Sequence, residues 1–190
     1  MILLYSLIII VILHELGHFW AAKLCNVKVL QFSVGFGKTI WCKTIGETTY
    51  NLKWIPLGGS VQLKDELNFT IDNTGLTNKP YLQKCFIVLA GIMMNCVTGG
   101  LAYLIGYHFY SVPLILFGWY SITIGLSNLL PIPCLDGSYV YIFAFEKLWG
   151  KEKALKYWEK VCSQWFKWLL IINILSLPYL GYLIYKGKIL

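Results

Sequence analysis

Apolar residues fill four long stretches of the chain, and charged residues are almost confined to the segments between them. The first stretch begins at the N-terminus, and the others cover residues 85–107, 109–145 and 168–185. A single charged residue, Asp136, interrupts the third. A helix needs about 20 apolar residues to cross the hydrocarbon core of a bilayer. We therefore expect four transmembrane helices, at about residues 2–25, 85–107, 112–133 and 165–185.

The segments between these stretches differ from one another in pattern. Residues 27–37 and 48–55 alternate apolar and polar positions before glycine or proline, which is typical of strands. They predict a small, membrane-associated hairpin or sheet at about 27–63. Residues 64–84 are polar and rich in turn residues, and they predict a cytoplasmic loop. Residues 146–160 mix lysine and glutamate with leucine and tryptophan, which favours an interfacial helix, with a solvated connector almost as consistent.

The predicted fold is an all-α polytopic membrane protein in one domain, 1–190, with a small β element after its first helix. Composition agrees with this prediction, because 57% of the residues are apolar and only 13% are charged. Soluble domains carry about 25% charged residues. A cleaved signal peptide would account for the first stretch alone. However, no basic residue precedes that stretch and no small-residue cleavage site follows it.

The net charge of +7 comes from lysine, because the chain contains no arginine. Proteins that read nucleic acid usually use arginine, so we exclude that class of partner. The lysines cluster between Lys23 and Lys84 and between Lys147 and Lys167, while the short turn near His108 has none. The positive-inside rule then puts both clusters in the cytoplasm and the N-terminus outside. We expect a multi-pass protein of a cell membrane, in a bacterium the inner or plasma membrane.

The candidate chemistry lies inside the first apolar stretch, in the sequence His14-Glu15-Leu16-Gly17-His18. Two histidines four residues apart fall on one face of a helix, because the helix turns once in 3.6 residues. Both imidazoles can then bind one zinc ion, and Glu15 stands beside them as a general base. The alternative is a chance match, in which the two histidines form a buried, hydrogen-bonded pair.

Two histidines leave a catalytic zinc ion one protein ligand short. The longer histidine motif of some soluble metalloproteases is excluded, because Ala21 and Leu24 stand where it needs glycine and histidine. Among the acidic residues, only Asp136 lies within an otherwise uncharged apolar stretch. A carboxylate is costly there, so it is functional by default, and we predict that Asp136 is the third ligand.

The surroundings and the depth of Asp136 support this assignment. Pro131 and Pro133 interrupt a helix, and Gly137 permits a turn, so we expect the aspartate on an unwound segment. His14 lies about 13 residues, or roughly 20 Å, below the outer end of its helix. That depth is in the cytoplasmic half of the membrane. Asp136 follows the inward-running third helix, so both halves of the site meet on the cytoplasmic side.

The chain resembles the site-2 proteases, which are intramembrane zinc metalloproteases. The resemblance rests mainly on two motifs, His14-Glu15-Leu16-Gly17-His18 and Asn128-x-x-Pro131-x-Pro133-x-Leu135-Asp136-Gly137. Weaker matches are Gly35-Phe36-Gly37, Pro56-Leu57-Gly58-Gly59, Asn78-Lys79-Pro80 and Ala90-Gly91 followed by Asn95. Ile92 and Ser138 depart from the family pattern. The short turn near His108 leaves no room for a PDZ domain, so we expect a minimal catalytic core.

The resemblance implies one zinc ion held by His14, His18 and Asp136, with Glu15 activating a water molecule. It also implies a β element that holds an extended segment of a single-span membrane protein as substrate. Backbone contacts to that substrate are candidates at Gly58, Gly59, Asn128 and Asn95. For Asn95, a role in packing helices together is equally consistent.

Two other classes of function remain open at this point. A metal or proton transporter could use intramembrane histidine, glutamate and aspartate, but such proteins usually show repeated halves, and none is visible here. A non-catalytic metal-binding membrane protein would not need a general base, yet Glu15 is present.

Overall fold

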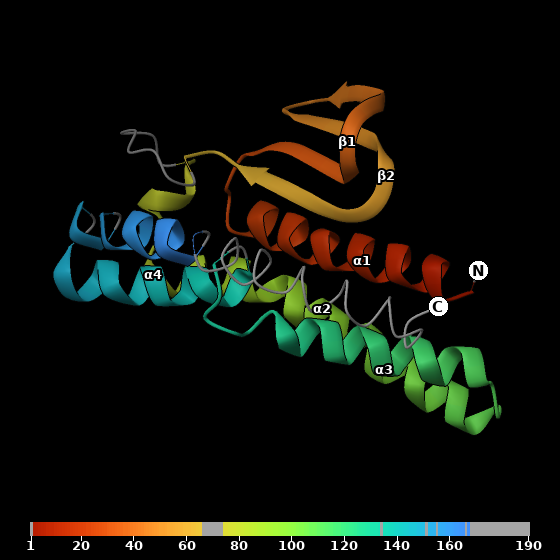
Figure 1. Ribbon diagram of the computed structural model, residues 1–190. Coiled ribbons are helices and arrows are strands. Elements are labelled where there is room, and N and C mark those ends of the chain that lie inside the picture. The colour runs from red at the N-terminus through yellow and green to blue at the C-terminus, as the bar shows by residue number, and fades with distance from the viewer. Residues whose placement is uncertain are drawn as a thin grey trace, which may run out of the picture. The chain divides into compact units, whose positions relative to one another are not determined.

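The computed structural model describes residues 2–65, 74–133, 135–150, 152–154, 156–165 and 167 (Figure 1). The chain divides into two compact units, Met1–Phe143 and Ala144–Leu190. All the residues of the candidate site belong to the first unit. The described elements are α1 (Ile2–Leu24), β1 (Val29–Ile45), β2 (Thr48–Leu63), the 3₁₀ helix η1 (Leu76–Asn78), α2 (Tyr81–His108), α3 (Val112–Ser127) and α4 (Asp136–Trp149).

Two of the described helices are long and apolar enough to cross a membrane, over residues Leu4–Leu24 of α1 and Tyr81–His108 of α2. Helix α3 is also apolar, but its 16 residues are fewer than a span usually needs. The mostly helical fold is thus confirmed, whereas the four predicted spans are not. Almost all of the predicted fourth helix, at about 165–185, lies outside the described residues.

Glycine brings the helices of the first unit unusually close together. A side-chain carbon at Gly17 of α1 would lie 2.5 Å from the carbonyl oxygen of Ala90 in α2. Likewise, a Cβ at Gly99 of α2 would lie 2.9 Å from the carbonyl oxygen of Gly118 in α3, and a Cβ at Gly118 would lie 2.6 Å from the carbonyl oxygen of Gly99. Small residues allow such backbone approach between membrane helices, where packing replaces the hydrophobic effect as the source of stability.

The predicted β element is present, and it lies on the side of α1 opposite to α2 (Figure 1). Strands β1 and β2 form an antiparallel pair in which Phe32 lies opposite both Val61 and Tyr50. The first part of β1 is therefore flanked by β2 on two sides. Phe19 of α1 contacts the rings of Phe32 and Tyr50, with centroids 5.7 and 6.2 Å away, and this aromatic cluster holds the strands against the helix.

An ion pair ties the turn between the strands to the start of β1. The ammonium group of Lys28 lies 2.8 Å from a carboxylate oxygen of Glu47. The hydrogen bond and the positive charge of Lys28 lower the pKa of the Glu47 carboxyl below its ordinary value. This pair lies outside the apolar helices, in a region exposed to solvent.

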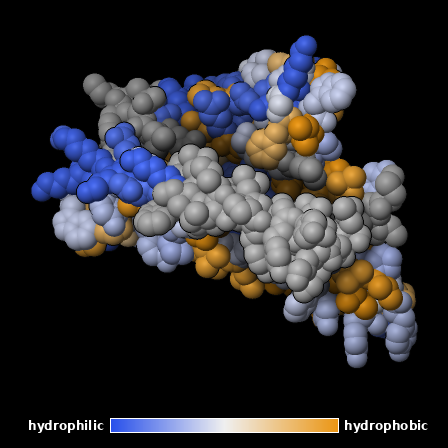
Figure 2. Space-filling model, viewed as in Figure 1, coloured by the Kyte–Doolittle hydropathy of each residue, from blue (hydrophilic) through white to orange (hydrophobic). Residues whose placement is uncertain are grey.

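The buried core collects where the end of α1, the start of β1, the end of β2, η1, the start of α2 and α4 meet. Its members are Ala21, Ala22, Val27, Val29, Leu63, Leu76, Cys85, Ile87, Val88, Ala90 and Phe143. Elsewhere, large apolar side chains of α2 and α3 remain exposed, among them Leu104, Leu116 and Trp119. Figure 2 shows apolar surface along the edge where these two helices lie. Such a surface suits contact with lipid.

Element boundaries differ from the sequence-based expectation near the two prolines. Helix α3 ends at Ser127, earlier than predicted, and residues 128–133 are irregular. Helix α4 begins at Asp136 itself, so the aspartate lies in the first turn of a helix and not on the unwound segment that was expected, which lies just before it. Helical residues are also described at 152–154 and 156–165, which overlap the range of the predicted interfacial helix. Residues 64–84, predicted as one loop, include η1 and the first turn of α2 where they are described.

Candidate metal centre

Helix α1 presents both histidines on one face, as their spacing predicts. The Nε2 atoms of His14 and His18 lie 3.2 Å apart, and the rings meet edge to face with centroids separated by 4.8 Å. Both residues are buried, with 7% and 9% of their surfaces exposed. Two imidazoles thus direct the same type of nitrogen toward one point inside the protein.

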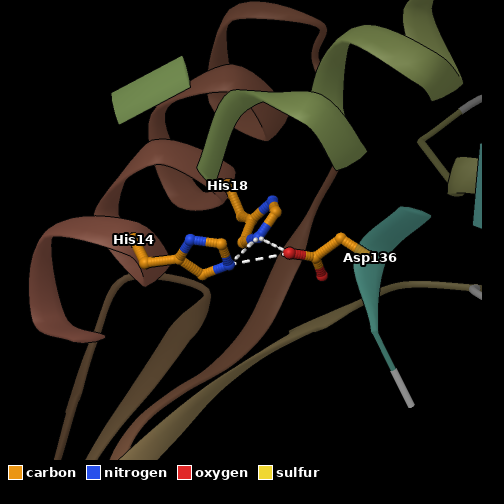
Figure 3. Close-up of side chains that lie close together, drawn as sticks. All are labelled: His14, His18 and Asp136. Carbon is orange, nitrogen blue, oxygen red and sulfur yellow. Dashed lines mark hydrogen bonds and ion pairs between the residues drawn. The ribbon is translucent and has the colours of Figure 1, made fainter. Parts of the chain in front are cut away.

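The carboxylate of Asp136 reaches this point from the first turn of α4 (Figure 3). Its Oδ2 atom lies 2.7 Å from Nε2 of His14 and 3.3 Å from Nε2 of His18. The start of α4 is fixed to the end of α3, because the N–H of Gly137 donates to the carbonyl oxygen of Asn128 at 2.7 Å. A side chain at position 137 would collide with the backbone of Leu129, so this close approach requires glycine.

Helix α2 contacts the second nitrogen, Nδ1, of both imidazole rings. Nδ1 of His18 donates to the carbonyl oxygen of Ile87 at 2.9 Å. Nδ1 of His14 lies 3.2 Å from the side-chain amide of Asn95. Between these two contacts, Gly91 lies directly against the rings, and a Cβ there would come within 2.9 Å of Cε1 of His14.

The three side chains fit a single metal ion. Their ligand atoms all lie within 4.8 Å of one another. For a tetrahedral zinc ion with ligands at about 2.0–2.1 Å, neighbouring donor atoms would be roughly 3.3 Å apart. The separations of 3.2 Å between the histidines and 3.3 Å from His18 to Asp136 are close to that value. The contact of 2.7 Å between His14 and Asp136 has the length of a charge-assisted hydrogen bond.

A cavity of about 220 Å³ adjoins two of the three side chains, His18 and Asp136. Glu15, His18 and Asp136 line its polar side, and its apolar lining includes Leu63, Leu76 and Tyr139. Gly59 of β2 also lines it, and a Cβ at that position would lie only 2.6 Å from Cγ of Glu15. The carboxylate of Glu15 therefore shares a cavity with the metal donors, directly beneath the backbone of β2.

The residues predicted to contact a substrate occupy three different kinds of position. Gly59 lines the cavity, whereas Gly58 has a φ of 111° and lies against the ring of Phe36. The amide nitrogen of Asn128 lies 3.4 Å from Nε2 of His14, next to the metal position. Asn95 is completely buried behind His14.

Sequence reasoning missed two supports of the histidines. Gly91 was noted only as part of a weak motif, although its position four residues before Asn95 places both on one face of α2. No sequence pattern singles out the backbone carbonyl of Ile87, because every residue carries such a group.

These features define a class of protein: a membrane protein with apolar helices that carry two histidines and an aspartate around one metal position, and a glutamate beside it. The comparison with known families agrees, because the model of Peptidase family M50 matches residues 2–115 and 107–172. The chain belongs to this family.

Similar proteins carry names consistent with this assignment. The chain is 38% identical over 114 residues to "Regulator of sigma E protease" of Haemophilus influenzae, which covers 57% of this chain and 25% of that protein. It is 40% identical over 100 residues to "Protease RseP" of Yersinia pestis, covering 50% of this chain and 22% of that one. The matched region is thus about a quarter of each relative.

A solved structure supports the fold as well. The structure of "Site-2 Protease from Methanocaldococcus jannaschii" matches with a TM-score of 0.56 and 20% identity, over 98% of this chain and 72% of that chain. The resemblance to site-2 proteases that the two sequence motifs indicate is therefore confirmed. The connection between α2 and α3, from residue 109 to 111, is too short to contain a PDZ domain.

Proposed function

We propose that this chain carries the catalytic site of an intramembrane zinc metalloendopeptidase, which hydrolyses a peptide bond within or near a transmembrane segment of another protein. One observation carries the proposal: two imidazoles and a carboxylate converge in a buried position that shares a cavity with Glu15. The relatives support it, because a matching Pasteurella multocida protein is named "Putative zinc metalloprotease PM1991". The whole chain, 1–190, then acts as a single metalloprotease domain.

His14, His18 and Asp136 hold the zinc ion in this proposal. When bound, zinc polarises a water molecule and lowers the pKa of that water to about 7. Glu15 accepts the proton of this water as its oxygen attacks the scissile carbonyl carbon. The carboxyl of Glu15 then donates the proton to the amine that leaves as the peptide bond breaks. Burial of both histidines keeps bulk water away from the donors.

The cavity favours an extended substrate. In a helix, backbone carbonyls are hydrogen-bonded internally, so a transmembrane segment must unwind before cleavage. Gly59 has no side chain, which lets the backbone of β2 lie directly against Glu15 at the wall of the cavity that an extended segment would enter. The amide of Asn128, beside the metal position, is placed to donate to a substrate carbonyl as negative charge develops on it. Gly58 extends the same strand, and buried Asn95 can act only through His14.

The substrate in this proposal is a single-span membrane protein, which enters the site from the bilayer. The distribution of lysines supports an orientation with the N-terminus outside and the site toward the cytoplasm. The relatives named above are bacterial, which supports a bacterial inner or plasma membrane as the location.

The test is co-expression of the chain with a tagged single-span substrate, followed by measurement of cleavage and of bound zinc. A Glu15→Gln variant should bind zinc as the wild type does and lose at least about 100-fold in cleavage rate, because general base catalysis is removed. The matched control is Gly100→Ala, since a Cβ at Gly100 meets nothing within 4 Å. Undiminished cleavage by Glu15→Gln would overturn the proposal. Glu15-independent transport of metal across vesicles would favour a transporter.

A further inference from the structure

Both metal-facing histidines have their second ring nitrogen bonded to the same helix. Because Nε2 of each ring faces the metal position, Nδ1 of each lies on the far side, against α2. His18 uses the backbone carbonyl of Ile87 there, at 2.9 Å. His14 uses the side-chain amide of Asn95, at 3.2 Å. Asn95 is 0% exposed, so neither a substrate nor bulk solvent reaches this amide.

The two partners differ in what they can offer. A neutral imidazole carries its proton on one nitrogen, and the nitrogen that binds a metal must be the other one. A metal at Nε2 therefore puts the proton on Nδ1, which then needs an acceptor. The carbonyl of Ile87 is always an acceptor. The amide of Asn95 offers an acceptor oxygen or a donor nitrogen, depending on a half-turn of the side chain.

In this structure the nitrogen of the amide faces the ring. Nδ2 of Asn95 faces Nδ1 of His14, so Nδ1 accepts and Nε2 carries the proton toward Asp136. In this orientation Oδ1 of Asn95 is buried and lacks a hydrogen-bond partner within the described part of the chain. Such an unpaired oxygen carries a desolvation cost that a hydrogen bond would remove. A half-turn of the amide would direct this oxygen to Nδ1–H of a metal-bound His14.

We propose that Asn95 is a positioning residue for His14: the oxygen of its amide accepts a hydrogen bond from Nδ1–H when Nε2 binds the metal. The amide thus selects the tautomer and fixes the plane of the ring. This inference rests on the proposed metal site, but it does not depend on peptide hydrolysis.

The surroundings of Asn95 separate this role from simple helix packing. Contact with α3 is made by other atoms of Asn95: its backbone carbonyl accepts from Oγ of Ser121 at 2.9 Å, and Gly125 lies against its Cβ. These contacts hold residue 95 in place while leaving the amide free to turn toward His14. A residue that served only to join α2 and α3 would direct its amide to α3.

The test uses the full chain, purified in detergent, and measures zinc affinity by competition with a chromophoric chelator. Asn95→Leu should weaken zinc binding by about 10–100-fold, the usual loss when a hydrogen-bond partner of a metal-binding histidine is removed. Asn95→Asp should keep or strengthen wild-type affinity, because a carboxylate also accepts from Nδ1–H. Ser121→Ala is the matched control, since it removes a bond to the backbone of residue 95 only, and its affinity should equal that of the wild type.

A second readout reports the tautomer directly. Nitrogen NMR of ¹⁵N-labelled histidine in the zinc-bound wild type should show His14 protonated at Nδ1, and Asn95→Asp should preserve that signature. Equal zinc affinity in the wild type and Asn95→Leu would overturn the inference. So would an Asn95→Asp variant that folds but binds zinc as weakly as Asn95→Leu, because only packing would then be at work. If Asn95→Leu fails to fold, the affinity and tautomer of Asn95→Asp decide alone.

The two proposals fail in different ways. Zinc binding that depends on Asn95 as stated, in a wild-type protein that cleaves no substrate, would uphold this inference and overturn the proposed protease function. A wild-type protein that binds no zinc would overturn both.

Discussion

Gly91 lies directly against the imidazole of His18, so that a methyl group at position 91 would come within 2.7 Å of Cε1 of that ring. The same methyl group would lie 2.9 Å from Cε1 of His14. The two imidazole rings therefore pack against a position of α2 that has no side chain. The rings fill the space that any other residue would occupy.

Substitution of this glycine should damage metal binding more than helix formation. Gly91→Ala must displace one or both rings, and we expect zinc affinity to fall at least about tenfold, as it does for other changes around metal-binding histidines. Gly100→Ala in the same helix is the control, because its Cβ would meet nothing within 4 Å. Competition with a chelator measures both. Equal affinities in the two variants would show that the rings can shift without loss of the site.

Asp136 should be needed for metal binding and not only for catalysis. Asp136→Ala removes a carboxylate that reaches Nε2 of both histidines, so zinc affinity should fall by more than about 100-fold, beyond the loss typical of residues outside the ligand set. Glu47→Gln, which removes an exposed carboxylate in the strand turn, is the control and should bind zinc normally. Wild-type affinity in Asp136→Ala would mean that another residue completes the ligand set.

Gly59 should affect the rate of cleavage without affecting zinc. A methyl group at position 59 would press on Cγ of Glu15, at 2.6 Å, and would also narrow the path of the substrate backbone. Displacement of a catalytic group by about 1 Å can cost roughly 100-fold in rate. We expect Gly59→Ala to cleave substrate up to about 100-fold more slowly than the wild type. Its bound zinc, measured by elemental analysis, should stay at the wild-type level. A joint loss of zinc and activity would instead indicate that the variant disturbs the metal donors.

The ion pair between Lys28 and Glu47 predicts a small dependence of stability on pH. The pKa of Glu47 is lowered in the folded protein from its ordinary value of 4.5. The pair therefore adds stability above that value, and the contribution is lost as the pH falls through the lowered pKa. Thermal unfolding in detergent should show the wild type slightly more stable than Glu47→Gln at pH 7. The difference should disappear in strong acid and shrink at high salt.

Sequence patterns could predict that His14, His18 and Asp136 come together, because their signals are local or exceptional. The spacing of His14 and His18 is a property of a single helix. Asp136 is exceptional as a lone carboxylate in an apolar stretch. The β element was equally accessible, since alternation over residues 27–37 and 48–55 needs no tertiary information.

The remaining features depend on contacts between helices, which the sequence does not state. The support of His18 by a backbone carbonyl, and the position of Gly91 under the rings, follow from how closely α2 approaches α1. The start of α4 at Asp136 depends on the bond between Gly137 and Asn128, which joins two segments across an irregular turn. Of the four predicted spans, α1 and α2 contain apolar stretches long enough to cross a membrane, whereas α3 ends at Ser127, before the two prolines, and is shorter. Almost all of the fourth lies outside the described residues.

Gly17 stands between the two histidines in the sequence and against Ala90 in space. Any event that separates α1 from α2 must also pull His18 away from the carbonyl of Ile87 and His14 away from Asn95. At the proposed metal site, ion binding and helix association would consequently be one linked equilibrium, in which a ligand that binds only the folded form stabilises it. The metal supply of the cell would then govern how much of this protein persists intact, quite apart from how fast it works.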